Sequence, residues 1–164
     1  MDSTYDAERQ SGRFRSDDER GDRSRTARIC LVGLGYVGLP LAVSFDDAGH
    51  HVAGYDLDEE KIATLQRGID TTGDVGDETI VESEVTYTAD PTSIGVADYA
   101  IIAVPTPVDE TNHPNLEFVE SAASMVGRWM STGTTVILES TVYPGATREV
   151  VVPALAEVSG LDAG

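Results

Sequence analysis

The sequence of 164 residues has a single cysteine, a single lysine and no long apolar run. One cysteine cannot form an internal disulfide, and the apolar surroundings of Cys30 predict a small buried side chain rather than a nucleophile. A membrane span needs about eighteen consecutive apolar residues, which this sequence lacks. The first residues also lack the apolar centre of a signal peptide. We therefore expect a cytoplasmic protein without a membrane partner.

Basic residues are scarce, with 11 Lys and Arg against 29 Asp and Glu and a net charge of −18. Such a surface repels phosphate backbones and anionic lipids, which excludes nucleic acid as a partner. An acid-rich, lysine-poor composition favours a halophilic protein, because screening in 1 M salt shortens the reach of charge repulsion to about 3 Å. An ordinary acidic cytoplasmic protein is the alternative interpretation.

The chain divides into a charged tail and a regular domain. Residues 1–27 mix charged residues with Ser, Gly and Thr without any period, which predicts a disordered tail. In residues 28–164, apolar strand-like runs alternate with helix-like segments, which predicts one α/β domain with a doubly wound, Rossmann-like parallel sheet. Strands are expected at 28–32, 51–55, 85–88, 98–104 and 134–138, helices at 37–48, 58–66, 116–130 and 146–158, and a short helical turn at 79–82.

A glycine-rich turn, Gly33-Leu34-Gly35-Tyr36-Val37-Gly38, joins the first strand to the first helix. The first glycine permits the tight turn, the second lets phosphates approach the backbone, and the third lets helix and strand pack closely. The helix N-terminus then offers amides to an anion. Asp56 follows Gly38 by eighteen residues, close to the spacing of about 20 for an acid that binds ribose hydroxyls. The pattern predicts a dinucleotide site, and an acid that repels a 2′-phosphate favours NAD over NADP.

Two further segments follow strands and should reach the same edge of the sheet. Val104-Pro105-Thr106-Pro107 presents a hydroxyl after the fourth strand, although a stiff strand exit would have the same sequence. Glu139-Ser140-Thr141 follows the fifth strand, which we expect to be buried. A buried carboxylate without a partner is costly, so Glu139 is either solvated in a cleft or bonded to a ligand. The Ser-Thr pair has helix capping as its alternative role.

With Leu39-Pro40-Leu41-Ala42 and Tyr143-Pro144-Gly145, these segments resemble the signatures of the N-terminal NAD-binding domain of nucleotide-sugar dehydrogenases. That family contains UDP-glucose, GDP-mannose and UDP-N-acetylhexosamine dehydrogenases, and the resemblance covers about residues 28–158. Glu139, where UDP-glucose enzymes usually have a lysine, makes the chain look more like the UDP-N-acetylhexosamine (N-acetylmannosamine or N-acetylglucosamine) 6-dehydrogenases.

The resemblance also implies roles for residues. Tyr36 and Val37 would offer backbone groups to NAD, and Asp56 and Lys61 would flank the adenosine ribose. Thr106 and Glu139 would line the nicotinamide side, and Thr141 would help to hold a catalytic water. No metal site is expected. The cofactor-binding set is therefore Gly33, Gly35, Tyr36, Val37, Gly38, Asp56, Lys61, Thr106 and Glu139.

The family's reaction, as the resemblance implies it, oxidises the primary alcohol of a nucleotide-linked sugar to a uronate in two NAD-dependent steps through a thioester on a cysteine. The family's catalytic cysteine, lysine and asparagine lie beyond the matching stretch. We therefore expect a cofactor half that binds NAD weakly, needs a missing C-terminal half for its nucleotide sugar, and leaves the oligomeric state open. The alternatives are related 3-hydroxyacid and 6-phosphogluconate dehydrogenases, which lack the proline-containing segments, and a non-catalytic NAD-sensing module.

The charge imbalance predicts a dependence of stability on salt. We expect the thermal melting point to rise between dilute buffer and molar sodium chloride, because screening weakens repulsion among the acidic side chains. Circular dichroism melts across a salt series would measure the shift. A melting point that does not rise would contradict the halophilic interpretation.

Overall fold

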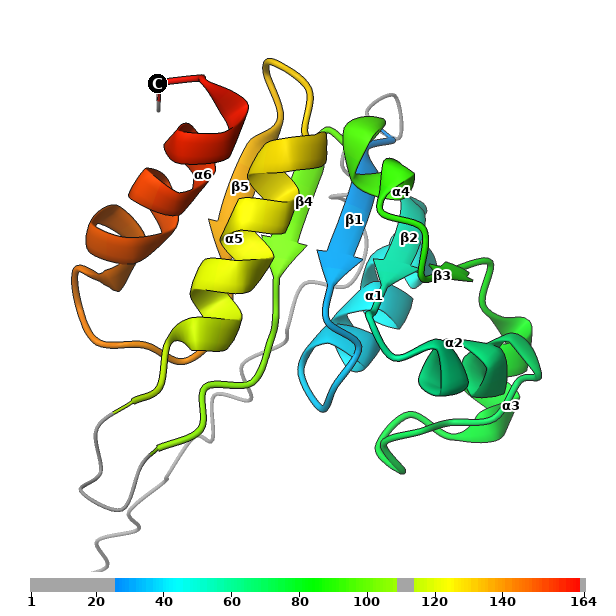
Figure 1. Cartoon of the computed structure of the whole chain (residues 1–164). Coiled ribbons are helices and arrows are strands. Elements are labelled where there is room, and N and C mark those ends of the chain that lie inside the picture. Colours follow the sequence, from blue (N-terminus) through cyan, green and yellow to red (C-terminus); the bar gives the residue numbers. More distant parts are fainter. Residues whose placement is uncertain (1–25, 109–113, 163–164) are drawn as a thin grey trace, which may run out of the picture.

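In the computed structural model, residues 26–108 and 114–162 form three layers, with helices on both faces of one parallel sheet (Figure 1). The sheet has five strands in the order β3-β2-β1-β4-β5. The strand order changes direction between β1 and β4, so the predicted doubly wound sheet is confirmed. Most of the expected disordered tail, residues 1–25, lies outside the described residues. The strands are β1 (Arg28–Val32), β2 (His51–Tyr55), β3 (Thr86–Thr88), β4 (Tyr99–Ile102) and β5 (Thr135–Leu138).

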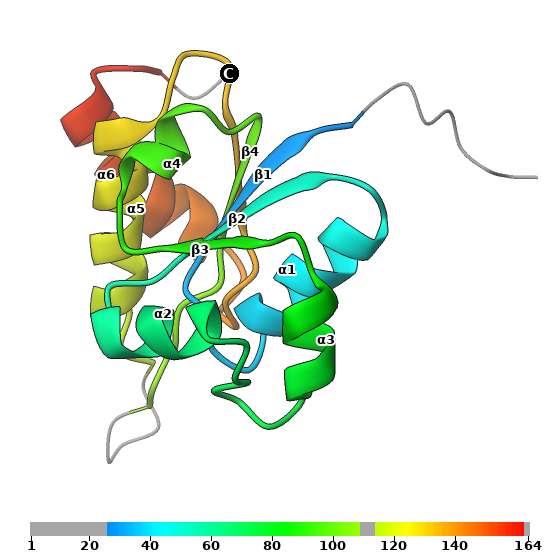
Figure 2. The ribbon, with the colours of Figure 1, turned by 90° about the vertical axis from the view of Figure 1, so that its right-hand side faces the viewer.

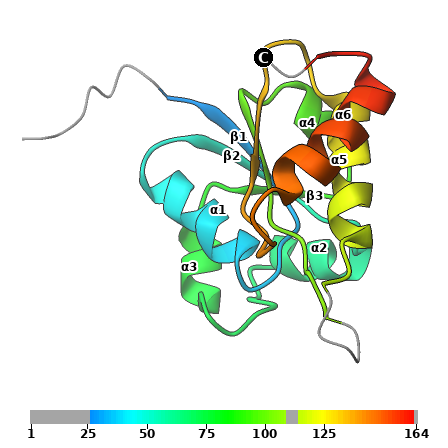
Figure 3. The same ribbon diagram turned by 90° about the vertical axis from the view of Figure 1, so that its left-hand side faces the viewer.

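The helices lie on opposite faces of the sheet, with α1 and α3 on one side and α5 and α6 on the other (Figures 2 and 3). Among the described residues, no helix combines the length and the apolar character that crossing a membrane requires. The helices are α1 (Gly38–Asp47), α2 (Glu59–Gln66), α3 (Asp77–Glu82), α4 (Thr92–Gly95), α5 (Glu117–Trp129), the π-helix η1 (Thr147–Val151) and α6 (Val152–Ser159), which continues η1.

Two apolar clusters, one on each face, hold the layers together. The first joins the sheet to α1, α2 and α3, and the second joins it to α4, α5, η1 and α6. Cys30 is fully buried in the second cluster. Burial raises the pKa of its thiol to about 11, against the opposing effect of a hydrogen bond with the Ser93 hydroxyl. The thiol is therefore protonated at neutral pH, as the prediction of a structural cysteine requires.

The elements differ from expectation at four points. The strand β5 is not buried, because its residues alternate between exposed and partly buried. The segment expected as one α-helix at 146–158 begins as the π-helix η1, at a point where Pro153 has no N–H to donate to the carbonyl of Glu149. The expected helical turn at 79–82 is a longer helix, α3, and the short helix α4 was not expected.

Asp70 orders the acidic stretch before α3. Its carboxylate accepts N–H bonds from Thr72, Val75 and Gly76 at 2.8–2.9 Å. Partial burial works to raise the pKa of Asp70, but the bonds from Gly76, Thr72 and Val75 outweigh it and hold this pKa well below its ordinary value. These local bonds give the loop a defined shape although few of its residues are apolar.

The third glycine of the turn sets the packing of α1 on the sheet, which predicts a matched pair of mutants. A Cβ added at Gly38 would overlap the carbonyl oxygen of Gly33, whereas a Cβ at Gly35 would have no described atom within 4 Å. We expect Gly38→Ala to lower the free energy of unfolding by about 2 kcal/mol, the usual scale of overpacking. Gly35→Ala is the control and should change it by less than about 0.5 kcal/mol. Urea denaturation would measure both, and equal losses would contradict the close-packing role.

Candidate functional site

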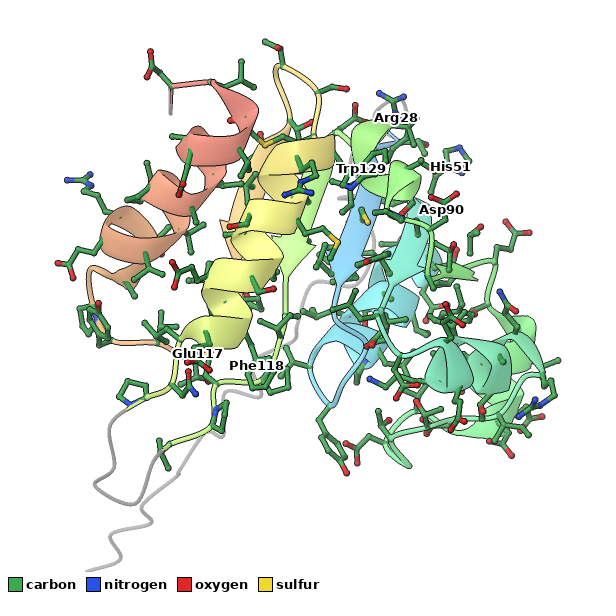
Figure 4. All side chains as sticks on the ribbon, viewed as in Figure 1. Arg28, His51, Asp90, Glu117, Phe118 and Trp129 are labelled. Carbon is green, nitrogen blue, oxygen red and sulfur yellow. The ribbon has the colours of Figure 1, made fainter. Side chains whose placement is uncertain are left out.

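The sequence-predicted site residues lie at one edge of the sheet. Because all five strands are parallel, their carboxyl ends meet there. Asp56 follows β2, the glycine turn follows β1, Thr106 follows β4 and Glu139 follows β5. Figure 4 shows this edge beside Glu117 and Phe118, the first residues of α5, with Arg28 and His51 at the opposite end. Segments that are distant in sequence therefore meet at this edge, which is where parallel α/β sheets bind their ligands.

The glycine turn has the shape of an anion cradle. Gly33 has a φ of 100°, and its N–H donates to the Tyr55 carbonyl at 2.8 Å. Leu34 is fully buried against Gly54, which anchors the turn. The N–H of Leu39 makes the first helical bond, to the Gly35 carbonyl at 3.0 Å. The amides of residues 35–38 precede that bond, so they are available to an anion at the start of α1.

The backbone of the turn is also open to a ligand. No described atom lies within 4 Å of a Cβ placed on Gly35, so the backbone there is open to a ligand. Tyr36 is 73% exposed and Val37 is 48% exposed, so both leave their own backbone accessible. The open amides and the missing Cβ fit the pyrophosphate of a dinucleotide.

Asp56 ties the glycine turn to the second helix. Its Oδ2 accepts the Leu34 N–H at 2.8 Å and the Lys61 ammonium at 2.7 Å. Its Oδ1 accepts the Asp58 N–H at 3.0 Å. Asp58 in turn caps α2 by accepting the N–H groups of Glu60 and Lys61, each at 3.0 Å. The cap therefore orients Lys61 toward Asp56, a contact that sequence spacing alone did not predict.

The carboxyl group of Asp56 is ionised because its partners outweigh its burial. The side chain is only 12% exposed, and desolvation is the largest single influence and raises the pKa. The hydrogen bond from Lys61, the amides of Asp58 and Leu34, and the charge of Lys61 together lower the pKa below the ordinary value of 3.8. At neutral pH a fixed, hydrogen-bonded carboxylate therefore lies beside the glycine turn.

The loops after β4 and β5 are joined to each other. The Ser140 hydroxyl donates to the Val104 carbonyl at 2.8 Å, and the Glu139 N–H donates to the Ile102 carbonyl at 2.9 Å. Ser140 thus bridges two loops, whereas helix capping was its alternative role. Glu139 and Thr141 are exposed and Thr106 is partly buried. Glu139 is thus not a buried carboxylate, because β5 lies at the edge of the sheet.

Tyr143 and Glu149 form a contact that the sequence did not reveal. The phenol of Tyr143 donates to Glu149 Oε2 at 3.1 Å, across the turn at Gly145. This hydrogen bond raises the pKa of Tyr143, and desolvation and then the charge of Glu149 raise it further. The loop that carries Thr141 is attached to the first turn of η1 by this pair. In residues 26–108 and 114–162, no group of three or more His, Cys, Asp or Glu side chains is placed to hold a metal ion.

The Asp56–Lys61 contact predicts a measurable change in titration. Lys61→Met should raise the pKa of the Asp56 carboxyl, because it removes both a hydrogen bond and a charge. Lys61→Arg should largely preserve the low pKa. The lowered pKa stabilises the fold above the ordinary value of 3.8, and this stability is lost as the pH falls through the folded value. Carboxyl carbon NMR across an acid titration would measure the pKa, and an unchanged midpoint in Lys61→Met would contradict the pairing.

Comparison with known proteins shows which family the chain resembles. Residues 27–163 match the UDP-glucose/GDP-mannose dehydrogenase family, NAD binding domain. Protein CapL of Staphylococcus aureus is 44% identical over 136 residues, which are 83% of this chain and 32% of that protein. The UDP-N-acetyl-D-glucosamine 6-dehydrogenase of Pseudomonas aeruginosa is 43% identical over 135 residues, covering 82% of this chain and 32% of the enzyme. The chain thus spans about a third of the length of these relatives.

Solved structures give the same result. The structure of GDP-mannose dehydrogenase from Pseudomonas aeruginosa, a ternary complex, superposes with a TM-score of 0.79 at 29% identity. The superposition covers 84% of this chain and 34% of the other. The resemblance carried by the glycine turn and the two proline-containing segments is confirmed, and NAD is the cofactor. The chain belongs to the UDP-glucose/GDP-mannose dehydrogenase family, of which it forms the NAD-binding domain.

Proposed function

We propose that the chain is the NAD-binding part of a UDP-N-acetylhexosamine 6-dehydrogenase. The observation that carries this proposal is the open glycine turn beside an ionised, fixed Asp56 carboxylate at the carboxyl edge of a parallel sheet. The amino sugar is favoured by Glu139 and by the 43% identity to the Pseudomonas aeruginosa enzyme named for UDP-N-acetyl-D-glucosamine. The whole enzyme would oxidise the primary alcohol of its sugar to a uronate, with NAD as the hydride acceptor.

Different residues of this chain would bind different parts of the cofactor. The amides of Gly35, Tyr36, Val37 and Gly38 would hold the pyrophosphate, and Gly33, whose N–H already bonds to Tyr55, would shape the turn beneath it. Asp56 would accept the ribose hydroxyls, and Lys61 would hold that carboxylate in place. A carboxylate has about four acceptor positions, and three are used within the protein, so one is left for a hydroxyl donor. The same carboxylate would repel a 2′-phosphate, and it cannot move away without breaking its bonds to the N–H groups of Leu34 and Asp58.

The nicotinamide side would be formed by Thr106 and Glu139, with Thr141 positioning a water near the sugar. Ser140 supports this side because its bond to Val104 fixes one loop against the other. The covalent chemistry of the family requires a reactive thiolate. Cys30 is buried, and its raised pKa keeps the thiol protonated, so it does not supply that nucleophile. We therefore infer that this chain alone binds NAD but does not oxidise a nucleotide sugar.

Calorimetric titration with NAD and NADP tests the proposal. The chain should bind NAD weakly and NADP more weakly still. Asp56→Asn should lower the affinity for NAD about tenfold or more, since a hydrogen bond to a charged group contributes about 1.5–3 kcal/mol. Glu60→Gln is the matched control, because it removes one exposed acid from the same region without touching the crevice, and it should leave the affinity unchanged.

Two results would overturn the proposal. Equal NAD affinity of the wild-type chain and a folded Asp56→Asn variant would show that Asp56 does not bind the ribose. Formation of NADH by the chain alone with UDP-N-acetylglucosamine or UDP-N-acetylmannosamine, followed at the nicotinamide absorbance, would show that the chain is a complete catalyst.

A further inference from the structure

Glu139 is an exposed acidic residue at the same edge of the sheet as the glycine turn, directly after β5. Its carboxylate is in neither of the two ion pairs that the described residues form, one of which is at Arg28, at the opposite end of the sheet, and the other at Asp56. Arg148, the nearest cation along the chain, is exposed on η1 and is also in neither pair. Within residues 26–108 and 114–162, no cation therefore neutralises Glu139 by direct contact.

The backbone of Glu139 is held against the end of β4. Its N–H donates to the Ile102 carbonyl at 2.9 Å, and the N–H of Ser140 donates to the same carbonyl at 3.3 Å. The Ser140 hydroxyl also donates to the Val104 carbonyl at 2.8 Å. These bonds fix the point from which the Glu139 side chain extends, so its charge stays within the reach of one side chain from the ends of β4 and β5.

The strand order sets the direction in which the cofactor would lie. In the proposed site, the adenosine ribose is at Asp56, after β2, and the pyrophosphate is at the glycine turn, after β1. β4 and β5 lie on the other side of β1, about 5 and 10 Å from it (Figure 1). The nicotinamide half of the cofactor would therefore extend over the ends of β4 and β5, toward Glu139.

The nicotinamide ring is the part of the cofactor whose charge changes in the reaction. The ring carries one positive charge in NAD and none in NADH, whereas the rest of the molecule is the same in both. A carboxylate beside the ring therefore attracts NAD by charge and gives NADH no such attraction. Two opposite unit charges about 4 Å apart in water change an affinity by about fivefold, and a slightly longer distance reduces this to about threefold.

We propose that Glu139 makes this domain favour the oxidised cofactor over the reduced one. This inference rests on the proposed function and deepens it. Oxidation of a primary alcohol to a carboxylate consumes one water and two NAD, and it releases two NADH and three protons. The two NAD must bind one after the other, so the first NADH has to leave in between. The Glu139 carboxylate favours this exchange, because its attraction for the ring ends when the ring becomes neutral.

Binding of a hydroxyl group is the alternative role for Glu139. A carboxylate at this position could accept hydrogen bonds from the hydroxyls of the nicotinamide ribose. That ribose is identical in NAD and NADH, so this role would raise both affinities by the same factor. The ratio of the two affinities therefore distinguishes attraction of the charged ring from binding of the ribose.

The test measures the affinities of the chain for NAD and NADH from the amide NMR signals of the glycine turn. Glu139→Gln keeps the size of the side chain and removes its charge. It should weaken NAD binding about three- to fivefold and leave NADH binding unchanged. Glu157→Gln is the matched control, because it removes one exposed acid in the last turn of α6, which ends at the opposite edge of the sheet (Figure 1). Its ratio of affinities should equal that of the wild-type chain.

Salt provides a second readout, which a purely steric role of Glu139 would not change. The screening length falls from about 10 Å at 0.1 M salt to about 3 Å at 1 M. The difference between the wild-type chain and Glu139→Gln in their ratios of affinities should therefore become smaller in 1 M sodium chloride.

Three results would overturn the inference: an unchanged ratio in Glu139→Gln, an equal loss of affinity for NAD and NADH, or a loss of the same size at both salt concentrations. Asp56→Asn in the same series should weaken both cofactors equally, because the adenosine ribose is the same in both. This response with an unchanged ratio in Glu139→Gln would remove the inference and leave the proposed function standing. A wild-type chain that binds neither cofactor would overturn both.

Discussion

The carboxylate of Asp56 is the group on which the cofactor crevice depends. It bonds to the turn after β1 through Leu34, to the start of the next helix through Asp58, and to the ammonium of Lys61. A charge that is nearly buried is costly without partners, and these three contacts offset that cost. They also place the carboxylate before any ligand arrives, so little conformational entropy is lost when a ribose hydroxyl binds. The same group therefore has a structural role beside its proposed binding role, and an alanine at this position would disturb both.

Backbone proximity explains why three glycines are needed in the turn. Gly33 faces the Ala103 carbonyl at the end of β4, where an added Cβ would approach to 2.8 Å, and Gly38 is in close contact with Gly33. Gly35 has open space instead, so the fold itself does not require its lack of a side chain. Two of the glycines thus let the strand and the helix approach, and the third leaves the space in which the proposed phosphates would lie. This division gives the motif its specificity, because packing alone would not require the middle glycine.

The elements that the sequence predicted are those whose signal is local. The apolar runs at 28–32 and 51–55 match β1 and β2, because buried parallel strands need continuous apolar residues. The exposure of β5 was missed because it depends on which strand occupies the edge of the sheet, a property of the whole fold. The contacts of Lys61 with Asp56 and Tyr143 with Glu149 depend on how the loops between them turn, and that of the Ser140 hydroxyl with the Val104 carbonyl depends on the pairing of β4 and β5. The η1 helix was missed because the expected helix at 146–158 ran through Pro153, whose missing N–H disturbs the bonding of the turn before it.

The two halves of the crevice differ in how far this chain determines them. On the adenosine side, the turn and the carboxylate are held by bonds within the chain and by the buried Leu34. On the proposed nicotinamide side, Glu139 and Thr141 are exposed, and only the loop backbone is fixed through Ser140. Preorganised groups bind a ligand with less loss of entropy than exposed side chains that must first be ordered. Within the proposed site, affinity for NAD should therefore come mainly from the adenosine side, where Asp56 is already fixed by its partners.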